Sequence, residues 1–188
     1  MEALLRTQML ALLVVLFIPY LAGAQSETQL RMPGPETQNL MLGTWSIKLQ
    51  YEPNKDMPKG NVAFGEEKWY PGPGGLSLVE EYREINSTGE ISGLGISWWD
   101  EKVKGYRVVW CESTNPGGCM VPNGIARWEG GQLTLSAEEE QGGKKMTFKE
   151  VFSQITPMAF KQALYMGESG SDLKLLVTIR ATRKTTSK

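Results

Sequence analysis

Residues 43–52 read Gly-Thr-Trp-Ser-Ile-Lys-Leu-Gln-Tyr-Glu, and this stretch decides the class of fold. Trp45, Ile47, Leu49 and Tyr51 alternate with polar residues along it. A period of two places the four large side chains on one face of an extended strand and the polar ones on the other. The stretch therefore predicts a half-buried strand of a β-sheet.

Segments of the same kind recur along the chain at intervals of roughly 10–14 residues, with no long helical pattern between them. The further strands are expected at 61–69, 76–85, 90–99, 106–111, 120–128, 132–137, 146–152, 158–166 and 173–179. The 21 glycines and 10 prolines suit the tight turns of an antiparallel meander. Closing such a meander into a barrel removes both of its edges. The sequence predicts an all-β, up-and-down antiparallel barrel of about ten strands, with a two-sheet sandwich as the alternative.

The first 24 residues have the pattern of a secretory signal peptide. The unbroken apolar run Met9–Ile18 is followed by Pro19 and by the small residues Ala22-Gly23-Ala24. This run is shorter than the roughly 18 apolar residues that a membrane-spanning helix needs. We therefore expect cleavage after Ala24, export to the periplasm or the extracellular space, and no membrane span in the mature protein.

The expected organisation is then a single domain behind a leader. It comprises a signal peptide at 1–24, an N-terminal tail with a short helical turn at 25–41, the barrel at 42–184 and a C-terminal tail at 185–188.

Charge and composition exclude several classes of function. The 188 residues include 20 Lys and Arg against 21 Asp and Glu, so the net charge of -1 gives no reason to expect nucleic acid as a partner. The chain contains no histidine, which removes the Ser-His-Asp triad, the usual zinc sites and haem ligation through a proximal histidine. No metal and no cofactor is expected.

Cys111 and Cys119 are the two cysteines of the chain. An even number of cysteines in an exported protein favours a disulfide. The intervening segment contains a proline and two glycines, so it can bring two strand ends together. A redox dithiol would need the spacing Cys-x-x-Cys, and a metal site would need more ligands. We predict a structural Cys111–Cys119 disulfide.

Two motifs carry a family resemblance. Leu42-Gly43-Thr44-Trp45 resembles the Gly-x-Trp that opens the first strand of lipocalins. Gly93-Leu94-Gly95-Ile96-Ser97-Trp98-Trp99-Asp100, followed by Tyr106 and Trp110, is similar to the pattern of a bacterial secreted family classed as a domain of unknown function. The match extends to Thr182-Arg183-Lys184. The resemblance implies a lipocalin-like barrel, but it supplies neither an activity nor catalytic residues.

The same resemblance implies a structural role for the first motif. In lipocalins an arginine near the last strand covers the tryptophan, and Arg180 or Arg183 is placed to cover Trp45 by a cation–π contact. Gly43 belongs to this structural set. The alternative is that Trp45 contacts a ligand directly.

Aromatic residues supply the candidates for a ligand cavity. Tyr82, Trp98, Trp110 and Phe148 each share a strand face with apolar residues and are expected to point inward. Neighbouring residues on a strand point to opposite faces, so one of Trp98 and Trp99 must face outward or lie at the rim.

Carboxylates are the remaining candidates for acid–base chemistry. Glu80, Tyr82 and Glu84 share a face with Leu76 and Leu78. If that face is inward, Glu80 and Tyr82 are buried polar groups that need partners and could orient a ligand. Alternatively, a register shift near Gly75 turns them toward solvent. The same two possibilities hold for the residue between Phe148 and Phe152, which is Glu150.

Three functions compete on these observations. The leading hypothesis is an exported, non-enzymatic barrel that binds a small apolar molecule. The first alternative is a calycin-type enzyme that uses a cavity carboxylate such as Glu80 or Glu150. The second is a protein-interaction module that has no ligand in its interior, and the volume of the cavity separates it from the other two.

Overall fold

The computed structural model describes residues 29–55, 57–87, 89–116, 118–120 and 124–185, so the expected signal peptide at 1–24 lies outside the described residues. The chain is almost entirely β-structure with two short 3-10 helices. In chain order the elements are η1 (Glu36–Met41), β1 (Gly43–Tyr51), β2 (Asn61–Pro71), η2 (Pro73–Gly75), β3 (Ser77–Asn86), β4 (Gly89–Asp100), β5 (Gly105–Glu112), β6 (Cys119–Met120), β7 (Ile125–Glu129), β8 (Gln132–Gln141), β9 (Lys144–Ser153), β10 (Ala159–Glu168) and β11 (Lys174–Arg183).

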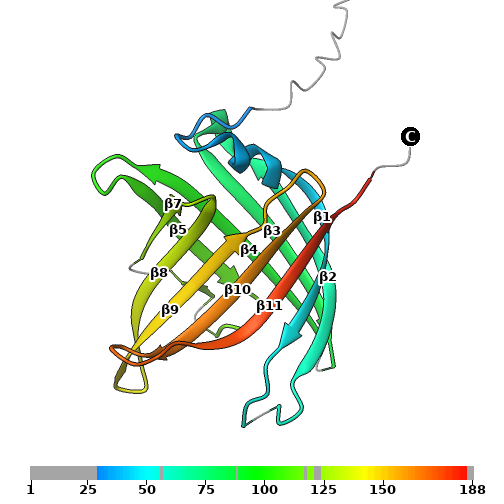
Figure 1. Ribbon diagram of the computed structural model, residues 1–188, viewed down its shortest axis with the longest axis vertical. Coiled ribbons are helices and arrows are strands. Elements are labelled where there is room, and N and C mark those ends of the chain that lie inside the picture. Colours follow the sequence, from blue (N-terminus) through cyan, green and yellow to red (C-terminus); the bar gives the residue numbers. More distant parts are fainter. Residues whose placement is uncertain (1–28, 56, 88, 117, 121–123, 186–188) are drawn as a thin grey trace, which may run out of the picture.

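The strands form a closed antiparallel barrel, as the sequence predicts (Figure 1). Each strand pairs with its neighbour in the chain from β1 to β5 and from β7 to β11, and β1 closes the ring by pairing with β11. Ten strands make the barrel wall. The two-residue strand β6 is not one of them, because it pairs only with β5. No helix within the described residues is long and apolar enough to cross a membrane.

The wall is weakest between β5 and β7. These strands share a single pair of residues, Tyr106 and Ala126, whereas β7 and β8 pair over five positions from Ile125 to Glu129. The one strand expected over 120–128 is in fact two, β6 and β7. β6 is held on β5 by the predicted disulfide, since Cys111 and Cys119 are partners in register and are bonded to each other.

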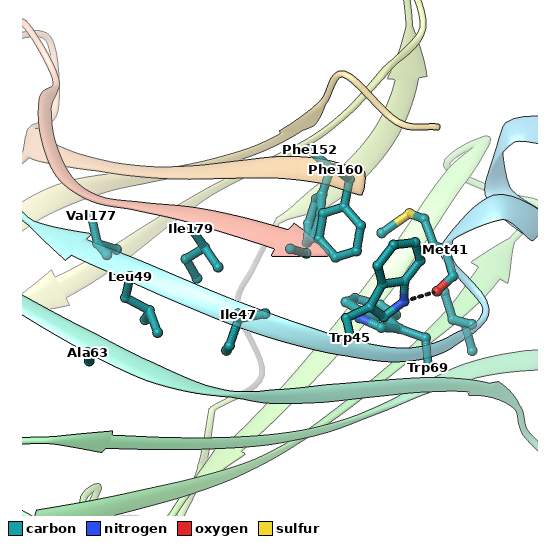
Figure 2. Close-up of a cluster of buried hydrophobic side chains, with 12 residues drawn as sticks. Met41, Trp45, Ile47, Leu49, Ala63, Trp69, Phe152, Phe160, Val177 and Ile179 are labelled. Atoms are coloured by element: carbon teal, nitrogen blue, oxygen red, sulfur yellow. Dashed lines mark hydrogen bonds between the residues drawn. The ribbon is translucent and has the colours of Figure 1, made fainter. Parts of the chain in front are cut away.

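The core runs along the inner face of β1, from Trp45 near its start to Leu49 (Figure 2). Trp45 is fully buried, with its indole Nε1 donating a hydrogen bond of 2.7 Å to the carbonyl of Met41. Phe160 packs edge-on against its ring, with 4.8 Å between the ring centroids. The alternating residues that the sequence places on one face of β1 therefore belong to this core: Trp45, Ile47 and Leu49 are buried in it, and Tyr51 packs against it.

Arg183 is the arginine that covers Trp45. Its guanidinium carbon lies 4.1 Å from the centroid of the Trp45 ring, and it donates to the carbonyls of Leu40 at 2.6 Å and Leu42 at 2.7 Å. Arg180 is exposed on the outer face. Gly43 has a φ of 121°, and a Cβ there would overlap the Arg183 guanidinium, so glycine suits this position for two reasons.

The N-terminal segment 29–41 covers the end of the barrel where β1 begins (Figure 1). Met32 packs against the core, and Gln38 and Met41 are buried. The backbone N–H of Arg31 donates to Gly75 at 2.7 Å, and the Tyr106 hydroxyl lies within hydrogen-bond distance of Gln38 Oε1, at 3.0 Å. The segment therefore forms one wall of the interior.

Candidate ligand site inside the barrel

Four glutamates inside the barrel are fully buried or line its cavity. Glu67 on β2 is 0% exposed and Glu84 on β3 is 1% exposed, while Glu80 and Glu150 line an interior cavity. The sequence left open whether Glu80, Glu84 and Glu150 face inward or outward, and the structure places all three inside. No register shift occurs near Gly75, because β3 pairs with β2 in one continuous register.

The inner wall has no positive charge to match these acids. Arg183 sits at one end of the barrel against Trp45, and Lys144 at the other end is exposed and paired with Glu168. Between these ends, no lysine or arginine among the described residues points inward. The ion pairs that the described residues form involve other carboxylates. The buried acids of the interior therefore have no cationic partner.

Glu67, Glu80, Glu150 and Gln162 form one polar group, which we call the Glu67 cluster. The indole Nε1 of Trp69 donates to Glu67 Oε2 at 3.1 Å, and the amide of Gln162 donates to Glu150 Oε1. Two buried acceptors have no partner, Glu67 Oε1 and Gln162 Oε1. A buried polar atom without a partner is uncommon, since each costs about 1–3 kcal/mol.

Burial without a counter-charge raises the pKa values of all three acids. The pKa of Glu67 rises to about 7 because of burial, reinforced by the charge of Glu150 and opposed by the hydrogen bond from Trp69. The pKa of Glu150 also rises to about 7 because of burial, opposed by the hydrogen bond from Gln162. Burial and the charges of Glu67 and Glu150 hold the pKa of Glu80 well above its usual range. Near neutral pH, Glu67 and Glu150 are therefore each present in both the protonated and the ionised form.

The cavity beside this cluster is small, with a volume of about 50 Å³. Its polar lining comes from Glu80, Glu150, Ser97 and Gln38. Its apolar lining includes Met32, Met41, Trp69, Leu78, Val108 and Phe152. A space of this size holds a few water molecules or a small organic group.

A second polar group, the Glu84 cluster, lies nearer the other end. The hydroxyl of Tyr51 donates to Glu84 Oε2 at 2.7 Å, as does the hydroxyl of Tyr82. The side-chain amide of Asn86 donates to Glu84 Oε1 at 2.7 Å. Burial and the bond to Glu84 raise the pKa of both tyrosines. Three donors thus hold one buried carboxylate.

Tyr82 and Trp110 lie between the two clusters. Tyr82 stands between Glu80 and Glu84 on β3, and its ring meets Trp110 edge-on at 5.6 Å. The Gly-x-Gly motif of β4 makes room for this indole. A Cβ at Gly93 would overlap the Trp110 ring, and one at Gly95 would lie 3.3 Å from it and 3.0 Å from Glu80 Oε2.

The structure places Tyr82, Trp110, Phe148 and Glu80 on the inner face and Trp98 on the outer one. Trp98 is 37% exposed, and its neighbour Trp99 points inward, with its ring 5.2 Å from that of Tyr106. The expectation for Trp98 is therefore corrected. The face that it shares with Leu94 and Ile96 is apolar but lies outside. On the inner face of β4, the positions next to the Trp110 ring are the glycines Gly93 and Gly95.

Glu67, Gln162 and Gln38 were not recognised from the sequence. Glu67 shares a face with Ala63 and Trp69, so the alternation of β2 could have marked it as inward. The alternation of β10 gives the same signal for Gln162. Gln38 lies on the 3-10 helix η1, where a single turn shows no apolar periodicity. Among the described residues, no three acidic or cysteine side chains are arranged to hold a metal ion.

No protein-family model and no curated protein matches the sequence, so membership of the secreted family stays a prediction. Among solved structures, the chain is similar to Rv2717c from M. tuberculosis, with 15% identity, 81% of this chain and 99% of that chain covered and a TM-score of 0.55. It is similar to the S-type phycobiliprotein lyase CPES from Guillardia theta, with 9% identity, 79% and 91% coverage and a TM-score of 0.56. A de novo fluorescence-activating β-barrel is 12% identical over 80% of this chain and 100% of its own, with a TM-score of 0.43. At such identities the likeness to the first two structures shows the fold alone: this chain has a lipocalin-like barrel.

Proposed function

We propose that the protein is an exported, non-enzymatic binding protein that holds a small molecule inside the barrel, beside Glu80 and Glu150. The observation that carries the proposal is an interior cavity with largely apolar walls, adjoining a cluster whose buried acceptors lack partners. Packing for stability alone favours neither a cavity nor an unpartnered polar group. Both are typical of sites that a ligand completes.

The apolar walls suit the body of the ligand. Trp69, Leu78 and Phe152 line the cavity from β2, β3 and β9. Contact with such walls stabilises a complex by roughly 25 cal/mol for each Å² of apolar surface removed from water, before the costs of association. The ligand enters where Met32, Gln38 and Met41 close the cavity, because this N-terminal segment belongs to no strand of the wall.

The Cys111–Cys119 disulfide supports export. Disulfides persist in oxidising compartments and are rare in the cytosol. The sequence pattern of residues 1–24 points the same way. Amino-terminal sequencing of the mature protein from its native compartment should begin at Gln25, and a mature protein that still begins at Met1 would contradict export.

The raised pKa values favour one alternative, an enzyme. Glu150, whose pKa burial raises to about 7, is suited to give and take a proton at neutral pH. Carboxyls of this kind also occur in sites that only bind. A rate that depends on Glu150 and is abolished in Glu150→Gln, without loss of ligand affinity, would establish the enzyme.

Native mass spectrometry of protein purified from its own compartment tests the proposal directly. A small molecule that leaves the protein only on unfolding is the expected result. Ligands identified in this way should change the tryptophan emission, because Trp69 lines the cavity. Trp69→Phe should remove part of that change, whereas Trp98→Phe, the matched variant on the outer face, should leave the binding-induced difference intact.

Two results together would overturn the proposal. They are the absence of any co-purifying molecule and an experimental structure in which side chains fill the interior. The third hypothesis, a protein-interaction module, would then be preferred, with the exposed apolar residues Leu94, Ile96 and Trp98 of β4 as its contact face.

A further inference from the structure

The chemistry of the interior restricts which ligand it can take. The inner wall offers carboxyl and amide oxygens from Glu67, Glu80, Glu150 and Gln162, with no inward lysine or arginine between the barrel ends in the part of the chain that the structure describes. A ligand that carries a carboxylate or a phosphate would find no cationic side chain to pair with here, and it would be repelled by those acids that are ionised. Anions are therefore disfavoured.

Two of the buried atoms without a partner are acceptors that a donor would satisfy, while Gln38 Nε2, from a residue on the cavity lining, is itself an unpartnered donor. Glu67 Oε1 and Gln162 Oε1 lack a hydrogen-bond donor, although these residues are only 0% and 5% exposed. Gln162 is bonded to Glu150, which lines the cavity, and the charge of Glu67 acts on Glu80, which also lines it. An ammonium group supplies up to three N–H donors and no acceptor. It therefore complements the carboxyl groups of Glu80 and Glu150, which line the cavity.

The apolar part of the cavity fits the same ligand. Trp69 and Phe152 line it and meet edge-on, with 5.7 Å between their centroids. Aromatic rings attract a cation through their faces and pack against an alkyl or aryl body. A small organic cation uses both properties of the site.

Resting on the proposed function, we infer that the ligand is a small organic amine, bound with its ammonium group among Glu67, Glu80 and Glu150 and its apolar body against Trp69 and Phe152. The small cavity volume of about 50 Å³ limits what enters without displacement of the N-terminal segment, so short amines bind to the closed form. Longer ones bind with Met32 and Gln38 moved aside.

Proton release accompanies this binding. An ammonium group favours the charged form of the surrounding carboxyls, so it lowers pKa values that burial alone holds near 7 in Glu67 and Glu150. Protons leave as the amine enters at pH 7. Affinity rises with pH from 5.5 to 8, because fewer protons remain to be displaced.

A matched ligand series tests the inference. Propyl, butyl and benzyl compounds are each offered as the amine, the alcohol and the carboxylate, and binding is measured by isothermal titration calorimetry at pH 7 and 8. The amine of each body should bind at least about tenfold more tightly than its alcohol, and the carboxylate should not bind. Titration in buffers of different ionisation enthalpy should show proton release at pH 7 that diminishes at pH 8.

Glutamine variants locate the charge that matters. Glu80→Gln and Glu150→Gln preserve shape, and each should weaken amine binding at least about tenfold while changing alcohol binding little. Glu81→Gln is the matched control, because this adjacent side chain lies on the outer face and accepts a hydrogen bond from Tyr70 at 2.7 Å. Proton release on amine binding is measured on the wild-type protein. The inference can therefore be tested even if one of the glutamine variants does not fold.

The outcomes separate the inference from the proposed function. If alcohols and amines bind equally well, the inference that the ligand is an amine is wrong, but the proposed ligand site is still supported. Binding of no compound in the series, with a different molecule found by native mass spectrometry, leads to the same conclusion. Binding of none, with nothing co-purifying and a filled interior, overturns both.

Discussion

Glu84 and Glu67 are both buried carboxyls on neighbouring strands, but their surroundings differ. Glu84 accepts hydrogen bonds from Tyr51, Tyr82 and Asn86, so both of its oxygens have partners. Glu67 accepts one from Trp69 on Oε2, and Oε1 has none. The first arrangement is complete in the protein itself, and the second is completed only by something added. The difference distinguishes a structural carboxylate from a binding one.

Replacement of each acid by leucine should separate them most strongly. Glu84→Leu leaves three donors without an acceptor and is expected to lower the free energy of unfolding by about 3–5 kcal/mol. Glu67→Leu removes an incompletely paired acid and should change stability by about 1 kcal/mol or less at pH 8. Urea unfolding of both variants measures the two effects. Equal losses would show that the two carboxyls have the same role.

The dependence of stability on pH sharpens the comparison. Glu67 has an ordinary pKa of 4.5 and a folded pKa of about 7, so between these values the folded protein binds more protons than the unfolded one. Stability is therefore full below about pH 4.5 and falls as the pH rises through 7, by roughly 3 kcal/mol from this group. In Glu67→Gln the total fall in stability should shrink by this amount, while Glu80 and Glu150, whose pKa values are also raised, account for the rest.

Urea unfolding at pH 5 and pH 8 measures that slope. Glu66→Gln is the matched control, because its carboxyl lies on the outer face and pairs with Lys184. A slope that is unchanged in Glu67→Gln and reduced in Glu66→Gln would place the titration outside the barrel.

Reduction of the disulfide should affect stability without affecting the acids. The bond closes a loop with a sequence separation of 8, and such a short loop contributes about 2–3 kcal/mol in the chain-entropy account. A Cys111→Ala/Cys119→Ala variant should melt at a lower temperature and retain the wild-type pH slope. Two free thiols titrated in native, unreduced protein would contradict the bond itself.

Tyr51→Phe is expected to have the smallest effect on the free energy of unfolding. It removes one of the three donors to Glu84 and should cost about 1 kcal/mol, since two donors remain. In the background of Glu84→Gln the same substitution should cost less, because the two side chains act together. Additive losses in the double mutant would show that the bond contributes nothing.

Strand alternation made the barrel predictable, because each strand buries one face. Trp45 and Ile47 on β1 show how well the pattern works where the outer face is polar. It failed for Trp98, since the outer face of β4 is apolar as well, and alternation cannot then tell inside from outside. It also gave one strand over 120–128, where the structure has β6 paired with β5 and β7 paired mainly with β8.

The candidate site was only partly predictable. Glu80 and Glu150 were recognised as candidates, but their orientation depends on register, and a shift of one residue turns a side chain to the other face. Gln38 reaches the cavity through the packing of η1 against the barrel end, which is a tertiary contact. The pairing of Arg183 with Trp45 came from the family resemblance, and the structure decides between Arg183 and Arg180.

The pairing of β1 with β11 has a consequence for the order in which the barrel forms. Every other pairing in the ring joins strands that follow one another in the chain or are separated by β6 alone, but this one joins Trp45 to Arg183. Loop closure over such a distance is slow, and it cannot begin until the last strand has been synthesised. Until then β1 and β10 present unpaired edges, which are prone to pair with other chains. The growing chain is thus most vulnerable to aggregation in the period before β11 is added, and the Arg183–Trp45 contact forms only when that period ends.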